Sequence, residues 1–431
     1  MSRRVVITGF GLVSPLGNSP EKLWAGLTEK KSAVAEFTQV PADALPFKYG
    51  AEAREFTGSS ENYGPLEKTL ARNIKKNQKS MCREMQMGIA VAQLAMTHAG
   101  FAPAKFNVQR IGAVYGSDFM ITLPEEFAAG IKKCLDADGK FHFDQWAEKG
   151  IPEVEPLWLL KYLPNLPAAH VAIFNDLRGP NNSLTLREVS SAIALGEAFR
   201  TVQRGHADAM LGGATGTKVN PMRTMHAALQ EDIARGDNPA ELSRPFDRDR
   251  SGAVLGEGAG ALLLEELEFA QARGAKIWGE VVGVGSSTVA DKTGKPNLKK
   301  AVGQAVKMAL ADAKLDAKDI GHIHAHGLST KMADASEAQA LAGIFPSFTP
   351  VVAAKANFGN LGAGSGLVEL IGSLLALESG KLFPTLNYTT PDPECPVNVV
   401  RGEDVPAGDS VVNISFTPQG QAGAVIVRRI A

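Results

Sequence analysis

Apolar and polar residues follow two alternating patterns along the chain. Short, mostly apolar runs typical of buried β-strands alternate with longer runs whose apolar residues recur at helical spacing. The strand-like runs lie at residues 3–9, 110–117, 207–214, 260–267, 320–327, 349–355 and 423–429. The helical runs lie at residues 19–30, 80–100, 190–205, 298–315 and 364–380. This alternation predicts an α/β protein with a covered, largely parallel or mixed sheet.

The pattern also indicates how the chain is divided. No Pro- or Ser-rich linker and no short-period repeat interrupts the 431 residues. A long helical pattern ends near residue 275, and a new strand-like run follows it. We therefore expect two halves, residues 1–275 and 276–431.

Composition excludes several classes of partner and cofactor. With 45 basic and 46 acidic residues, the net charge of −1 predicts no binding to nucleic acid or to an anionic membrane. No apolar run is long enough to span a bilayer, and the first one reads as a strand rather than a signal peptide. Three scattered cysteines, Cys82, Cys134 and Cys395, favour a reducing compartment, so we expect a cytoplasmic protein. The glycine clusters match neither dinucleotide nor P-loop spacing, and no nucleotide cofactor is expected.

One acidic residue stands out at the start of an apolar helix. In the stretch TLREVSSAIALGEA, residues 185–198, apolar side chains recur at helical spacing after Glu188. A carboxylate at the entrance of a buried helix requires a partner or a chemical role. Glu188 is therefore the first candidate functional residue.

Five stretches together resemble the β-ketoacyl-acyl-carrier-protein synthases of the elongating type, in the thiolase superfamily. They are RRVVITGFGLVSPLG, GPNNSLTLREVSSAIALGEAFRTVQRGHADAMLGGA, SRPFDRDRSGAVLGEGAGALLLEE, HAHGLSTKMADASEAQAL and KANFGNLGAGSGLVEL, in the family's order. The resemblance implies a five-layered αβαβα fold of two pseudo-repeated halves, usually paired as a dimer. It also implies acyl carrier protein as a partner, with phosphopantetheine belonging to that substrate and no cofactor of the chain's own.

The resemblance gives Glu188 a sharper meaning. In this family a cysteine at a helix N-terminus takes the acyl group from the carrier, because the helix dipole and a neighbouring histidine favour the thiolate. Counting from Gly179 and from Gly196 places Glu188 at the cysteine position without a gap. The nearby Ser190 and Ser191 lie further into the helix, at positions that pack and cap in the family.

Further family positions fall on identifiable residues of this chain. The first active-site histidine corresponds to His326, and Thr330 is retained. The threonine that contacts pantetheine in the family is replaced by Leu328. If His326 takes no part in catalysis, it is a histidine that is retained in the buried core.

The remaining catalytic positions fall in the second half. The family's lysine and its glutamate partner correspond to Lys355 and Glu369, which can also be read as a buried structural ion pair. The second histidine is replaced by Asn360. Asparagine donates a neutral hydrogen bond but carries no proton, so the histidine pair that decarboxylates malonyl units is incomplete.

A last departure concerns the loop that closes the family's active site. There a phenylalanine gates the pocket and lends its backbone N–H to the oxyanion hole. In the stretch FTPQGQA that position falls on Pro418, which has no N–H. Loss of one oxyanion donor costs on the order of 10²- to 10³-fold in rate in other enzymes.

Two roles are open for Glu188. As a structural carboxylate it would accept first-turn amides of its helix and pair with a cation such as His326 or Lys355. As a general acid or base it would need a pKa raised by an apolar cleft. Asp334 and Glu337 are expected to cap and face a helix rather than to act in catalysis.

Three functions remain as hypotheses. The first is a non-condensing partner, like a chain-length factor, that pairs with an active ketosynthase in fatty-acid or polyketide biosynthesis. The second is an enzyme with altered acyl-thioester chemistry, such as decarboxylation, carried out by Glu188 and His326. The third is an ordinary β-ketoacyl synthase, which the site residues contradict. Residues 116–146 leave open whether a contact there joins a homodimer or a heterodimer.

Overall fold

The computed structural model describes residues 3–430, and two groups of five strands in it share one design. The first group is β1 (Val5–Val13), β4 (Ile111–Ser117), β5 (Asn181–Thr185), β6 (Ala209–Thr217) and β7 (Glu257–Glu266). The second is β8 (Gly279–Thr288), β9 (His322–His324), β10 (Pro350–Val352), β12 (Ser410–Phe416) and β13 (Gln421–Arg428). A two-residue strand, β11 (Asn398–Val399), continues beyond β10, and β2 (Ala35–Glu36) pairs with β3 (Tyr49–Gly50) separately.

The two groups have the same strand order and the same directions. In space the first runs β1-β7-β6-β4-β5 and the second β8-β13-β12-β9-β10. In both, the first two neighbouring pairs are antiparallel and the last two parallel. The groups meet where β1 pairs with β8, from Val5 opposite Val281 to Ile7 opposite Gly279. This equivalence confirms the two pseudo-repeated halves.

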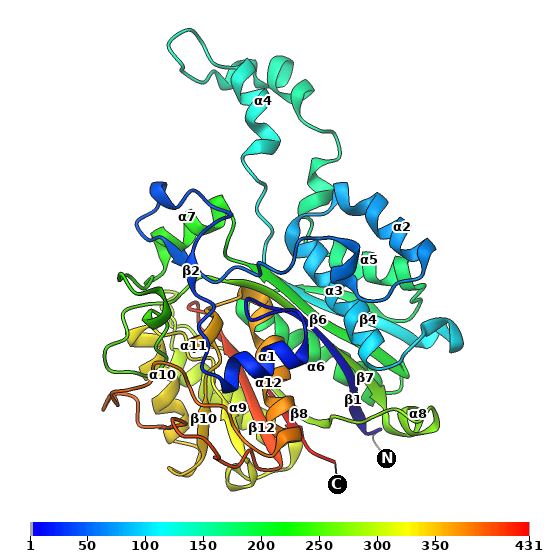
Figure 1. Ribbon diagram of the computed structural model, residues 1–431, viewed down its shortest axis with the longest axis vertical. Coiled ribbons are helices and arrows are strands. Elements are labelled where there is room, and N and C mark those ends of the chain that lie inside the picture. The colour runs from blue at the N-terminus through cyan, green and yellow to red at the C-terminus, as the bar shows by residue number, and fades with distance from the viewer. Residues whose placement is uncertain (1–2, 431) are drawn as a thin grey trace.

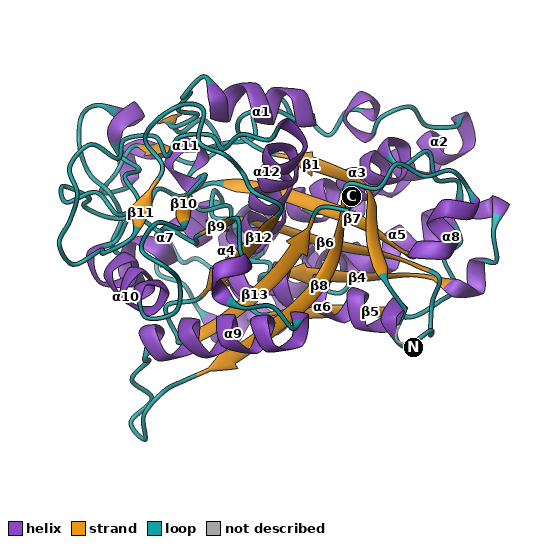
Figure 2. Ribbon diagram, turned by 90° about the horizontal axis from the view of Figure 1, so that it is seen from below, coloured by secondary structure: helices purple, strands orange, loops and turns teal. Residues whose placement is uncertain are grey.

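The helices complete the layers (Figures 1 and 2). Two central helices, α6 (Ser190–Gln203) and α12 (Ser365–Ser379), lie between the two strand groups and contact each other. On the outer face of the first group lie α3 (Arg83–His98) and α5 (Leu166–Asn175); on that of the second lies α9 (Leu298–Ala313), with α10 (Lys331–Ala342) against it. The remaining helices are α1 (Pro20–Thr28), α2 (Lys68–Asn77), α4 (Glu125–Lys133), α7 (Pro221–Gln230), α8 (Leu267–Ala272) and α11 (Lys355–Phe358). The predicted five-layered, thiolase-like α/β architecture is confirmed.

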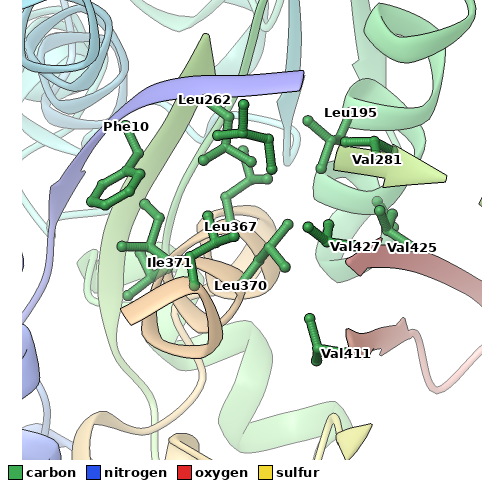
Figure 3. Close-up of a cluster of buried hydrophobic side chains, with 14 of the residues drawn as sticks. Phe10, Leu195, Leu262, Val281, Leu367, Leu370, Ile371, Val411, Val425 and Val427 are labelled. Atoms are coloured by element: carbon green, nitrogen blue, oxygen red, sulfur yellow. The ribbon is translucent and has the colours of Figure 1, made fainter. Parts of the chain in front are cut away.

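The core explains why the central helices are so apolar. A helix covered by a sheet on each side must present apolar residues nearly all round. Figure 3 shows Leu195 of α6 and Leu367 of α12 beside Leu262 of β7 and Val427 of β13. These four side chains are at most 1 % exposed. Truncating any of them to alanine would therefore leave a cavity in the layer that both halves share.

This arrangement brings four chain segments together at one end of the central helices. Glu188 precedes α6, Asn360 precedes α12, His326 follows β9, and Pro418 lies in the turn between β12 and β13. Short helical turns at Arg187–Val189 and Gly362–Gly364 pack against each other there. The apolar layers therefore enclose a polar centre contributed by both halves.

Within residues 3–430, no helix has the length and apolar character needed to cross a bilayer.

Candidate functional site

Glu188 lies at the centre of a buried ionic cluster. Its side chain is 1 % exposed, and its Oε1 is 2.8 Å from Lys218 Nζ. Its Oε2 lies 3.5 Å from Arg187 Nε. Both cations also contact a second carboxylate: Lys218 Nζ and Arg187 Nη2 lie 2.8 and 2.7 Å from Glu231 Oε1. Four ion pairs thus connect the two cations and the two carboxylates in a ring. We call Arg187, Glu188, Lys218 and Glu231 the Glu188 cluster.

Local structure aims these side chains inward. Arg187 has a φ of +54°, the left-handed region that non-glycine residues seldom occupy, and this bend directs the chain into the first turn before α6. Lys218 directly follows the buried strand β6 and is 1 % exposed. Glu231 directly follows α7. Each charge therefore stands at the end of a regular element, where its backbone is fixed by the fold.

The cluster determines the ionisation of Glu188. Burial by itself would raise the pKa of this carboxyl, but the charges of Lys218 and Arg187 lower it well below its usual value. Burial also opposes the charge of Lys218, yet Glu188 and Glu231 raise its pKa above the ordinary value. Glu188 is therefore a carboxylate at neutral pH. The expected cation partners, His326 or Lys355, were wrong, because Lys218 and Arg187 occupy that role.

Asn360 extends the cluster through its side-chain amide. Its Nδ2 donates to Glu188 Oε1 at 3.1 Å. Its Oδ1 accepts from the backbone N–H of Gly362 at 3.1 Å and from Ser365 Oγ at 3.3 Å. The amide thus ties the start of α12 to the start of α6, and both of its polar atoms are engaged.

His326 lies in the same polar centre and is neutral. Burial first, and the nearby Lys355 charge second, lower the pKa of the imidazole well below its usual value. Lys355 Nζ donates to His326 Nδ1 at 3.2 Å and to its backbone oxygen at 2.9 Å, and it also pairs with Glu369. Glu337 accepts the N–H groups of His326 and Gly327 at 2.7 and 2.9 Å. The structure thus brings together His326, Lys355 and Glu369, in contact as the family positions predict.

The positions expected to meet pantetheine are also buried. Leu328 is 6 % and Thr330 7 % exposed. Thr330 is the N-cap residue of α10, and its backbone oxygen accepts from Arg250 Nε at 3.1 Å. A contact of either side chain with a pantetheine arm stays a prediction.

Pro418 lies in the turn between β12 and β13. Thr417 N donates to Gln421 O at 2.9 Å and Gly420 N to Thr417 O at 3.1 Å, so residues 417–420 form a tight connection between β12 and β13. Arg187 Nη1 donates to Gln419 Oε1 at 3.2 Å. The Glu188 cluster is therefore tied to this loop, in which residue 418 offers no backbone N–H.

Two cavities adjoin the cluster. One of about 280 Å³ is lined by Leu186 and Val189, on either side of Arg187 and Glu188 in the chain, and by Gln421. The cavity lined by Arg187, Lys218 and Glu231, together with Phe119 and Arg223, holds about 30 Å³. That is room for about one water molecule and far less than an acyl chain requires. Among the residues described, no group of three or more His, Cys, Asp or Glu is placed to hold a metal ion.

The main residues that sequence reasoning missed are Lys218, Glu231 and Arg187. Each is a single charge at the end of an otherwise apolar or regular segment. That position was the only signal in the sequence, and it does not reveal which charges meet in space.

Comparisons with known proteins match both halves of the chain to one family. The model of the β-ketoacyl synthase N-terminal domain matches residues 2–270, and that of the C-terminal domain matches residues 278–389. The chain belongs to the β-ketoacyl synthase family. The "3-oxoacyl-[acyl-carrier-protein] synthase 2" of Synechocystis sp. is 32 % identical over 406 residues, 93 % of this chain and 92 % of that protein. The protein of the same name from Staphylococcus aureus strain COL is 31 % identical with the same coverage.

Solved structures of this family superpose along the whole chain. A β-ketoacyl synthase from Burkholderia phymatum STM815 is 29 % identical with a TM-score of 0.85, and the ishigamide ketosynthase/chain length factor is 26 % identical with a TM-score of 0.83. Both matches cover 100 % of each chain. The family therefore includes neighbours named as synthases and a neighbour named as a ketosynthase/chain length factor.

The ionisation of Glu188 makes a prediction for acid stability. Its folded pKa is lowered, so its stabilising contribution is complete above the unfolded value, about 4.3, and is lost as the pH falls toward the folded value. We expect wild type to exceed Glu188→Gln in free energy of unfolding at pH 7, and the gap to narrow below about pH 4. Urea unfolding across this range measures it. Glu55→Gln, in an exposed pair with Lys22, is the matched control; a gap for Glu188→Gln that does not change with pH contradicts the assignment.

Proposed function

We propose that this protein is a non-condensing, chain-length-factor-like subunit that pairs with an active ketosynthase in acyl-carrier-protein-dependent fatty-acid or polyketide biosynthesis. The observation that carries the proposal is the Glu188 cluster. At the position that the resemblance assigns to the nucleophilic cysteine stands a carboxylate, and two cations, the buried Lys218 and the half-buried Arg187, hold it ionised. A carboxylate in two ion pairs is engaged in structure, and transfer of an acyl group from a thioester to it would form a mixed anhydride, which is less stable than the thioester.

Two neighbouring features support the same function. Asn360 stands at the second histidine position, where its amide donates to Glu188. The cavity lined by Arg187, Lys218 and Glu231 themselves admits about one water molecule. Chemistry on a carrier-bound acyl chain would need space, a proton carrier and a nucleophile at this point.

The alternative of acid–base chemistry by Glu188 and His326 receives less support. A general acid or base works best with a pKa near the operating pH. The pKa of Glu188 is lowered and that of His326 is also lowered, so both groups are held in one protonation state at neutral pH. The synthase relatives are named 3-oxoacyl-[acyl-carrier-protein] synthase 2, and the Cys-dependent condensation that the family resemblance implies for such synthases conflicts with Glu188.

A direct assay separates these functions. The purified protein is mixed with acyl- and malonyl-acyl carrier protein and examined by intact-protein mass spectrometry and by release of CO₂. We expect no acyl adduct, no elongation and no CO₂ above background, and Glu188→Gln to give the same result. Elongation by the protein alone refutes the proposal, and CO₂ release that His326→Ala abolishes favours a decarboxylase.

A further inference from the structure

Strand β9 and the two residues after it carry three alternating histidines, His322, His324 and His326. All three side chains are at most 1 % exposed. His326 belongs to the polar centre through Lys355, whereas the other two have no part in the site described above. His322 and His324 point to the same side of β9, because alternate residues of a strand do so. Two further buried imidazoles therefore need hydrogen-bond partners of their own.

A serine of the central helix α12 lies between these two rings. Ser373 Oγ is 3.1 Å from His322 Nε2 and 2.8 Å from His324 Nδ1. The other nitrogen of each ring meets the backbone. His322 Nδ1 lies 2.8 Å from the Ala407 oxygen, and the Ala354 N–H donates to His324 Nε2 at 3.4 Å. We call His322, Ser373 and His324 the histidine network; it joins β9 and α12 to the segments at Ala354 and Ala407.

The two ends of the histidine network determine the place of every proton in it. A backbone N–H only donates and a backbone carbonyl only accepts. His324 therefore accepts from Ala354 at Nε2, and its single proton is on Nδ1, which donates to Ser373 Oγ. The serine hydroxyl then donates to His322 Nε2, and His322 Nδ1–H donates to the Ala407 oxygen. Both rings are thus neutral with the proton on Nδ1, and neither has a free nitrogen for a second proton.

The groups that face the histidine network offer no compensation for a charge on it. β10 and β12, which pair with β9, contain no titratable residue, and the acidic residues near Ala407 in the chain are exposed. On α12, Glu369 lies one turn before Ser373 but pairs with Lys355, the residue after Ala354. Within residues 3–430, no carboxylate forms an ion pair with His322 or His324. A proton taken up there would therefore be an uncompensated buried charge near Lys355.

The ionisation of the two rings agrees with this proton order. Burial lowers the pKa of His322 to about 4, against a smaller opposing effect of its bond to Ala407. For His324, burial first, and then the neighbouring His322 and Lys355, lower the pKa well below its usual value. Both imidazoles of the histidine network are therefore neutral at pH 7.

We infer that the histidine network is an acid-sensitive switch, which holds residues 354–360 in place while both rings are neutral and releases them when the rings take up protons. A proton on His324 Nε2 would face the N–H of Ala354, and two donors form no hydrogen bond. The residue before Lys355 would then lose its anchor. Asn360 of the same segment donates to Glu188, so release also loosens the Glu188 cluster. The inference concerns conformation and goes beyond the proposed function, because it applies equally to a catalytic and to a non-condensing protein.

Isotope-edited NMR of the histidine ring nitrogens tests the proton order in the full-length chain at neutral pH. We expect His322 and His324 to be neutral with the proton on Nδ1. His322→Asn and His324→Asn assign the two signals by their disappearance. A proton on Nε2 of either ring, or a charged ring, contradicts the network.

Urea unfolding measures the acid sensitivity. The stabilising effect of a ring held neutral in the fold is complete above the unfolded pKa and is lost as the pH falls toward the folded pKa. Each such ring raises the unfolding constant about tenfold between about pH 7.5 and about pH 5.5, because an unfolded histidine titrates near pH 6.5. We expect His322→Asn and His324→Asn each to reduce the wild-type rise about tenfold. His206→Asn, at an exposed histidine, is the matched control and should leave the rise unchanged. Network variants that keep the full wild-type rise contradict the switch.

Hydrogen exchange of the wild-type chain measures release of residues 354–360 and needs no substitution. After correction for the intrinsic effect of pH, their protection is expected to fall about tenfold between about pH 7.5 and about pH 5.5, and this fall should disappear in His324→Asn. Ser373→Ala, which removes the central hydroxyl, should lower protection about tenfold already at neutral pH. Ser379→Ala, at an exposed serine of the same helix, is its control and should change protection less than about twofold. Equal protection of wild type at both pH values, or of the two serine variants, overturns the switch.

Discussion

Lys218→Met is expected to destabilise the protein by about 3–5 kcal/mol, the cost typical of removing one partner from a buried ion pair. Lys218 is 1 % exposed and contacts both carboxylates of the cluster, Glu188 and Glu231. Methionine retains the apolar stem but removes the charge. The buried Glu188 and the half-buried Glu231 would then share the single charge of Arg187, and the pKa of Glu188 would rise.

Urea or thermal unfolding measures the free energy of unfolding of Lys218→Met and of a control variant. Lys22→Met is the control, because Lys22 pairs with Glu55 at the surface, with side chains 56 % and 50 % exposed. Exposed pairs contribute about 0–1 kcal/mol. Equal effects of Lys218→Met and Lys22→Met would show that the Glu188 cluster does not stabilise the fold.

A double variant assigns the effect to the pair. Lys218→Met combined with Glu188→Gln leaves a neutral amide where the uncompensated carboxylate would be. We expect the double variant to lose less stability than the sum of the two single variants, because the residues interact directly. Additive losses would place the effect of Lys218 elsewhere, for instance on Glu231 alone.

The fold illustrates what sequence patterns can and cannot predict. Apolar periodicity located the central helices, because a helix between two sheets must be apolar on nearly all sides. The same periodicity could not predict that β1 pairs with β7 and β8, since strand order depends on contacts between distant segments. The two-half repeat entered through the resemblance, and the matching strand order of the two groups confirms it.

The site shows the same limit more sharply. Glu188 is conspicuous in the sequence because an apolar helix follows it. Its partners Lys218 and Glu231 are ordinary charges in sequence terms and become a cluster only when β6 and α7 place their ends beside α6. Predicting His326 or Lys355 as the partner failed because those residues satisfy each other and Glu369. The sequence indicates which residue needs a partner, and the fold determines which charge supplies it.

Glu188→Cys alone is expected to give no condensing enzyme. A thiol at the start of α6, beside Lys218 and Arg187, would be favoured as thiolate by the helix N-terminus and by both cations. Asn360 would still carry no proton, and Pro418 would still offer no N–H to an oxyanion. A reactive thiol would therefore be formed without the groups that stabilise the reaction.

Adding the histidine and the backbone N–H to Glu188→Cys should increase its acylation rate step by step. We compare Glu188→Cys with Glu188→Cys/Asn360→His and with the triple variant that also carries Pro418→Gly, which supplies a backbone N–H. Intact-protein mass spectrometry measures the rate at which each variant is acylated by acyl-acyl carrier protein. We expect the double variant to be acylated on the order of 10²- to 10³-fold more slowly than the triple variant, because the double variant keeps Pro418 and therefore lacks one oxyanion donor. The same Asn360→His and Pro418→Gly background with Glu188→Ala, which lacks any nucleophile, is the control. Efficient condensation by Glu188→Cys alone would mean that Asn360 and Pro418 are no obstacle, and that a single substitution separates this chain from an active synthase.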